Sequence, residues 1–195
     1  MKSILNIFFL LLSLSLINSP IIAQEEMPEM TPEQKVWIDY MTPGWAHNMM
    51  AKSVGEWKTE TSFWQSPGAE PVKSEGSVNN KMILGGRYLH SEHSGNAWGM
   101  EMNGISTTAF DNTTEEFLNT WIDNLGTGLA FSKGKYDKEN NTVNFLGKMV
   151  DPMAGKEVEF KQVLKFIDDN TQMFEMYLFD DGKEFKMIEM KSTKK

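Results

Sequence analysis

The residues best suited to chemistry in this chain are three histidines, a single arginine and a few carboxylates, in a sequence of 195 residues without cysteine. His90 and His93 lie in the segment His90-Ser91-Glu92-His93, whose spacing resembles that of metal ligands. On a strand, however, His90 and Glu92 point to one face and His93 to the other. A His90–Glu92 site would need a third ligand from a neighbouring strand, and the lack of cysteine excludes thiolate sites. We therefore predict no metal site.

Arg87 is the only arginine beside 18 lysines. A single arginine suggests a position that needs a planar, permanently charged group. Two interpretations remain open. Arg87 either forms a structural clamp on the ring of Trp57 or on the carboxylate of Asp123, or binds the carboxylate of a ligand inside the fold.

Asp123 follows Trp121 by two residues, so both side chains are expected on one face of a strand. If that face is buried, Asp123 lies near the rim of the fold or pairs with a cation. Met100 and Met102 also share a face and suit either an adaptable ligand cavity or an ordinary core.

Other motifs add little chemistry. His47 is expected to bond a loop through its side chain, because the sequence identifies no carboxylate partner for catalysis. The chain contains no phosphate-binding glycine loop, nucleophile elbow or zinc-protease helix motif. We predict no catalytic residues, although an enzyme using His90, Glu92 and Asp123 inside the fold is the alternative function.

The N-terminus has the features of an export signal. Lys2 precedes an apolar run over 4–17, and Ala23 follows a polar break. This order is typical of a secretory signal peptide rather than of a membrane span. We predict a signal peptide over 1–23, a flexible leader over 24–31 and a periplasmic or secreted location.

Length and charge limit the class of partner. The chain after the signal fits one domain that is able to bury a full core. A formal net charge of −8 disfavours nucleic acid and anionic membranes. We therefore predict neither partner, and the sequence does not determine the oligomeric state.

The remaining chain divides into a short helical part and a long strand-rich part. Hydroxyl residues before prolines predict helices over 32–40 and 43–53, forming a capping unit over 32–54. After residue 55, short aromatic and β-branched runs alternate with turn residues. The predicted strands cover 56–64, 74–84, 86–93, 99–110, 115–123, 130–136, 141–149, 157–166, 171–179 and 183–191.

So many consecutive strands with short loops favour closure. An open sheet of this size would leave two long unprotected edges. The fold class we predict is all-β: an antiparallel up-and-down barrel of about ten strands over 55–192, preceded by short capping helices.

Several ordered motifs carry a family resemblance that spans roughly residues 47–191. They are His47-Asn48-Met49-Met50, Gly55-Glu56-Trp57, Leu84-Gly85-Gly86-Arg87-Tyr88-Leu89, Trp121-Ile122-Asp123-Asn124-Leu125-Gly126-Thr127 and Gly134-Lys135-Tyr136-Asp137. With these motifs the chain resembles a bacterial family catalogued as domain of unknown function 1579. By fold analogy it also resembles calycins, the group that contains lipocalins, fatty-acid-binding proteins and nitrobindins.

The calycin resemblance carries two implications for the site. Lipocalins open their first strand with Gly-x-Trp and place a basic side chain across the indole, which would assign Arg87 to Trp57. The histidine that ligates haem in nitrobindins lies late in the chain, and this sequence has no histidine after His93. We therefore expect no haem and no other cofactor.

We predict an exported barrel that binds a small apolar or amphipathic molecule, with an acidic group of the ligand met by Arg87. A non-catalytic envelope interaction module is a further alternative. The predicted ligand-contacting residues are Trp57, Arg87, Tyr88, His90, Met100, Met102, Trp121 and Asp123.

Overall fold

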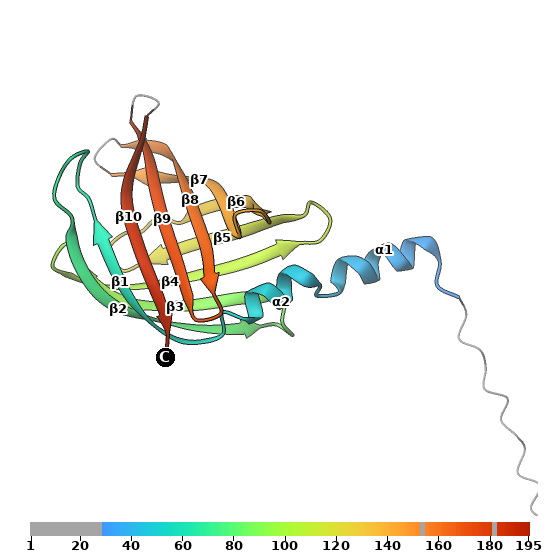
Figure 1. The fold of residues 1–195 in the computed structure, drawn as a ribbon. Helices are drawn as coiled ribbons and strands as arrows, with labels where there is room; N and C mark the ends of the chain where they lie inside the picture. Colours follow the sequence, from blue (N-terminus) through green and yellow to red (C-terminus); the bar gives the residue numbers. More distant parts are fainter. Residues whose placement is uncertain (1–28, 153–154, 181–182) are drawn as a thin grey trace, which may run out of the picture.

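A computed structural model describes residues 29–152, 155–180 and 183–195. The predicted signal peptide and most of the predicted leader lie outside these residues. The described chain folds into two helices and ten strands (Figure 1). They are α1 Pro32–Met41, α2 Trp45–Ala51, β1 Gly55–Phe63, β2 Val72–Ile83, β3 Tyr88–Ala97, β4 Met100–Asp111, β5 Glu116–Asp123, β6 Ala130–Asp137, β7 Thr142–Asp151, β8 Lys156–Asp168, β9 Thr171–Asp180 and β10 Lys183–Lys194.

The ten strands form one closed barrel, which confirms the predicted fold class. Each strand pairs antiparallel with the next strand in the sequence, and β1 pairs with β10 to close the barrel. In this closing pair Trp57 lies opposite Lys194, and Phe63 lies opposite Ile188. Closure removes both free edges that an open meander of this length would leave unprotected.

Side chains alternate between the interior and the outer surface along each strand. Trp57, Phe117 and Phe160 point inward and are each 1% exposed. Lys58 and Glu60, on either side of Thr59 in β1, are exposed. Together with the register, this alternation gives the inward or outward direction of paired strand residues, apart from the register shifts between Lys186 and Ile188 and between Phe166 and Asp168.

The two ends of the barrel differ. The closed end holds α2 and the C-terminal end of β10; the open end holds loops 64–71, 98–99 and 124–129 (Figure 1). At the closed end the buried residues of α2 join a cluster of large side chains from the strands. The buried members are Ala46, Met50, Phe110, Phe117, Val143 and Phe145. This cluster packs α2 against the strands at the closed end.

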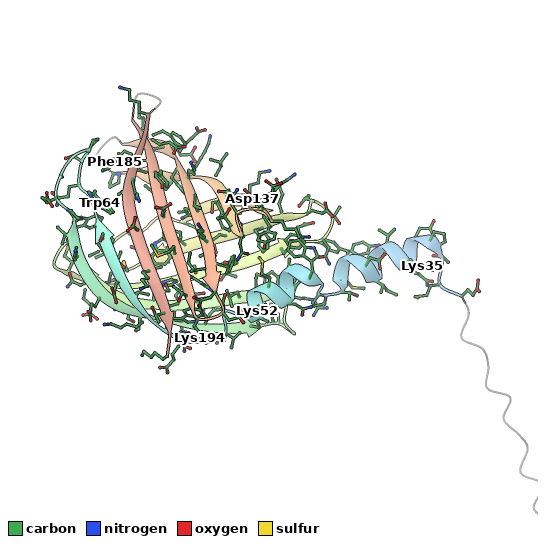
Figure 2. All side chains as sticks on the ribbon, in the orientation of Figure 1. Lys35, Lys52, Trp64, Asp137, Phe185 and Lys194 are labelled. Carbon is green, nitrogen blue, oxygen red and sulfur yellow. The ribbon has the colours of Figure 1, made fainter. Side chains whose placement is uncertain are left out.

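Helix α1 differs from the prediction that both helices cap a larger body. It projects away from the barrel (Figure 1), and none of its residues is buried. Figure 2 shows Lys35 on this projecting helix, far from the strands. The capping box of Thr31 and Gln34 stabilises its N-terminus. No helix of the described residues is long and apolar enough to cross a membrane.

Candidate ligand site inside the barrel

Four of the predicted ligand residues lie together on the inner wall of the open half. Met100 and Met102 occupy the inward positions of β4, and Trp121 and Asp123 occupy those of β5. In the β4–β5 pair Gly104 lies opposite Asp123, and Ser106 lies opposite Trp121. The prediction that Trp121 and Asp123 share a face is therefore confirmed.

The indole of Trp121 is held in one orientation. Its Nε1 donates a hydrogen bond to Asp123 Oδ2 at 2.6 Å. The ring lies over Gly104, and a Cβ at that position would overlap the ring atoms. Glycine therefore leaves room for the indole to lie close to the backbone of β4.

Asp123 connects this indole to the loop at the open end. Its Oδ1 accepts hydrogen bonds from the backbone N–H groups of Leu125 at 2.9 Å and Gly126 at 3.0 Å. Both carboxylate oxygens are thus engaged by neutral donors from its own segment. The carboxylate orients Trp121 and the turn that follows β5, and it forms no ion pair with a cation of the described residues.

His93 completes the site from the neighbouring strand β3. Its ring contacts the Trp121 ring edge-on, with centroids 4.9 Å apart and an interplanar angle of 74°. Its Nε2 lies 3.3 Å from Ser106 Oγ. Burial lowers the pKa of His93 to about 4, because desolvation disfavours the charged imidazolium. The ring is therefore neutral at neutral pH. We call His93, Met102, Ser106, Trp121 and Asp123 the open-half site.

A small cavity borders this site. It measures about 30 Å³ and is lined by inward side chains that include Thr61, His93, Met102 and Met190. That volume holds one or two water molecules. All four of these side chains also remain partly accessible to solvent.

Arg87 lies outside the barrel, in the turn between β2 and β3, and it contacts neither Trp57 nor Asp123. Its Nη2 donates to the carbonyl oxygen of Met41 at 2.7 Å, and its Nη1 donates to that of Leu84 at 3.3 Å. The carbonyl of Met41 is one of the unpaired acceptors at the C-terminus of α1. A cation is favourable there because of the helix dipole. The predicted clamp on a ring or carboxylate is therefore wrong.

The basic side chain across the Trp57 ring belongs to Lys194. Lys194 Nζ lies 5.5 Å from the ring centroid and donates to the carbonyl of Lys52 at 3.0 Å. Figure 2 shows Lys52 and Lys194 close together at the closed end. Trp57 Nε1 donates to the carbonyl of Ser53 at 2.8 Å. Trp57 thus joins the first strand, the last strand and the turn after α2, away from the open-half site.

The other predicted residues point outward. Tyr88 and His90 share the outer face of β3 with Glu92, whose Oε1 lies 3.3 Å from His90 Nε2. Lys81 Nζ binds the same carboxylate oxygen at 3.0 Å. The barrel wall separates His90 and Glu92 from Asp123, so the three proposed acid–base residues do not form one site. In the described chain no three His, Asp or Glu residues gather as metal ligands.

His47 has the loop contact that was predicted for it. It is buried in α2, and its Nδ1 accepts a hydrogen bond from the backbone N–H of Gly44 at 3.0 Å. Burial, and second the charge of Arg87, lower the pKa of His47. The ring therefore acts as a neutral acceptor at the N-terminus of its own helix.

Sequence reasoning missed His93, Ser106, Thr61 and Met190. The strand alternation that places His90 and His93 on opposite faces already indicated that one of them points inward. If Trp57 and Gly104 face inward, the register places His93 inward beside them, as the β2–β3 and β3–β4 pairs show. Register between strands, rather than position within one strand, was the missing information.

Fold and site together define a class: a closed, ten-stranded, antiparallel calycin-like barrel with one end filled and a small aromatic and thioether-lined site in the other half. The chain belongs to the family described as "Protein of unknown function (DUF1579)", whose model matches residues 42–194. Helix α1 therefore lies just outside the matched region.

Two solved structures share the architecture. Rv2717c from M. tuberculosis is similar over 79% of this chain and 99% of its own, with 12% identity and a TM-score of 0.59. The S-type phycobiliprotein lyase CPES from Guillardia theta is similar over 82% of this chain and 96% of its own, with 8% identity and a TM-score of 0.52. At these identities the likeness shows the fold alone. No curated protein matches the chain in sequence.

Proposed function

We propose that this chain is an exported binding protein that holds a small ligand in the open half of its barrel. The observation that carries the proposal is the small cavity of the open half, which is lined by His93, Met102 and Met190. Inward-facing Trp121, whose ring contacts that of His93, is partly accessible, whereas helix α2 and its cluster cover the closed end. Export rests on the sequence of residues 1–23 alone.

The chemistry of the wall supports binding rather than catalysis. The indole of Trp121 and the thioethers of Met102 and Met190 offer polarizable apolar contacts, and the hydroxyls of Thr61 and Ser106 offer a few polar ones. A mostly apolar lining with a few polar groups is typical of small-molecule sites. The cavity of about 30 Å³ is smaller than such sites, so ligand entry requires the flexible thioethers to move aside.

The test is native mass spectrometry of the mature protein purified from its own host, beside the same sample after denaturation. The proposal predicts an added mass of a small molecule that disappears on denaturation. The adduct should be lost in Trp121→Ala and kept in Tyr88→Phe, which alters the outer face. An adduct that survives Trp121→Ala would place the ligand elsewhere. A mass of the bare chain, together with no binding of any small aromatic probe, would overturn the proposal.

A further inference from the structure

We propose that the part of the ligand held against Trp121 is flat and carries no charge. The inference rests on the proposed ligand site and specifies the chemical class that this site accepts. It also departs from the idea of an acidic ligand met by Arg87, since that side chain holds the end of α1 outside the barrel.

The first argument is the distribution of charge on the inner wall. Among described inward positions of the open half below the rim, the titratable side chains are His93 and Asp123. Asp123 already accepts three hydrogen bonds, from the Trp121 indole and two backbone N–H groups. His93 is partly buried, and its ring contacts an indole and a hydroxyl. An anionic group of a ligand would meet no cation here, and a cationic group would meet no free carboxylate.

A charge without a partner is strongly disfavoured in such a place. Burial of an ionised group costs far more than burial of a neutral polar group, unless an opposite charge or several hydrogen bonds compensate. On the inward positions, lysines occur at the rim of the opposite wall, at Lys156 and Lys183, which are both exposed. A charged tail of a ligand can reach the rim, but the portion on Trp121 has to be neutral.

The second argument is the shape of the Trp121 surface. One face of the indole rests on Gly104, its Nε1 is engaged by Asp123, and the His93 ring meets it edge-on. Trp121 points inward and is partly exposed, so part of its indole remains accessible from the barrel lumen. An indole that is fixed in this way by Gly104, Asp123 and His93 offers a flat π surface, which favours an offset-stacked aromatic or conjugated ring. The neutral imidazole and hydroxyl beside it suit a hydrogen-bonding edge on that ring.

A matched pair of fluorescent probes tests the inference directly. N-phenyl-1-naphthylamine is neutral, and its 8-sulfonate has the same ring system with one negative charge. Each is titrated into the mature protein and followed by probe emission, at low salt and in 0.5 M NaCl. High salt screens the repulsion that a chain of net charge −8 exerts on the anion. We expect the neutral probe to bind at least about tenfold more tightly at both salt concentrations.

Two variants locate the binding. Trp121→Leu should weaken the neutral probe at least about tenfold, and Met190→Trp should block it by filling the cavity, provided that circular dichroism shows a folded barrel. Trp37→Leu serves as the control, since Trp37 lies on the projecting helix α1 and contacts Tyr40 of the same helix rather than the open-half site. Binding of the neutral probe that is unaffected by both site variants would overturn the role of Trp121.

The failures of the two proposals are distinguishable. If the sulfonate binds as tightly as the neutral probe in high salt, and Trp121→Leu weakens both, the site exists but the requirement for neutrality is refuted. If neither probe binds at any concentration tested, the ligand-binding function itself fails, and the inference fails with it.

Discussion

Protonation of His93 makes the stability of the barrel depend on pH in a range where few other groups titrate. An unperturbed histidine has a pKa near 6.5, whereas burial lowers the pKa of His93 in the folded barrel to about 4. Between these two pH values, the imidazole of His93 is therefore protonated in the unfolded chain but neutral in the folded chain. Stability from this group is fully present above pH 6.5 and is lost as the pH falls toward 4.

The size of the loss follows from the two pKa values. Relative to pH 8, linkage gives a decrease in the free energy of unfolding of about 0.8 kcal/mol at pH 6 and about 2 kcal/mol at pH 5. His47 adds a loss of the same sign, because its pKa is lowered mainly by burial. Carboxylates with lowered pKa values, such as Glu175 and Asp111, add theirs at lower pH. The contributions of His47, Glu175 and Asp111 are the same in the wild type and in a variant at position 93, so they cancel in the comparison.

The assay is urea unfolding, followed by tryptophan fluorescence or circular dichroism, at half-unit steps from pH 8 to pH 5. His93→Gln keeps a polar group of similar size but cannot be protonated, so its stability should fall less with decreasing pH. The difference between the two curves should reach about 2 kcal/mol at pH 5. Asn79→Gln, an exposed uncharged position on the outer face of β2, should follow the wild-type curve. Parallel curves for wild type and His93→Gln would refute the account of a buried neutral imidazole.

Three further changes probe other parts of the structure. Gly104→Ala should destabilise the barrel by about 1–3 kcal/mol, because the new Cβ overlaps the Trp121 indole; urea unfolding measures it. Asn112→Ala removes hydrogen bonds to three carbonyls at the end of α1, so amide exchange in α1 should accelerate while the barrel melts unchanged. Lys194→Met removes a cation from the Trp57 ring and should cost about 0.5–2 kcal/mol, measured by thermal unfolding.

Each of these variants has a matched control. Gly95→Ala also adds an inward methyl, but its nearest neighbours would lie at 3.6 Å, an ordinary contact, so it should be the milder change. Asn79→Ala alters an exposed outward asparagine of β2 and should leave α1 exchange unchanged. Lys195→Met removes an exposed ion pair with Glu56, worth little in stability. Equal effects in control and variant would contradict the corresponding argument.

The strands could be predicted because their local pattern and their tertiary role agree. Each of the ten predicted runs corresponds to a strand, with differences at the ends. The third shows why ends fail: it was expected to stop at His93, yet β3 continues to Ala97. Ser94, Gly95 and Asn96 look like a turn. In the barrel, Gly95 instead allows β3 to pass close to Gly76 of β2, a tertiary reason that composition does not reveal.

Closure of the barrel depends on residues that carry no strand signature. The last strand was expected to end at Lys191, but β10 extends to Lys194, and its last three residues also pair with β1. Ser192, Thr193 and Lys194 are polar and lie near the chain terminus, so propensity alone disfavours a strand there. They are extended because β1 offers an unpaired edge, and the backbone hydrogen bonds gained at closure outweigh that weak preference.

The case of Arg87 shows where reading a single residue stops being sufficient. Its uniqueness suggested a position that needs a planar cation, and the partners considered for it were side chains alone. Its actual acceptor is the backbone carbonyl of Met41, and every residue has such a carbonyl. A carbonyl at the C-terminal end of a helix differs from the others because it has no intrahelical hydrogen-bond donor and is free to accept from a side chain. This acceptor is defined by helix geometry rather than by residue type, so it can be recognised only once the structure shows α1 beside the β2–β3 turn. The cation beside the Trp57 ring is Lys194 instead of Arg87.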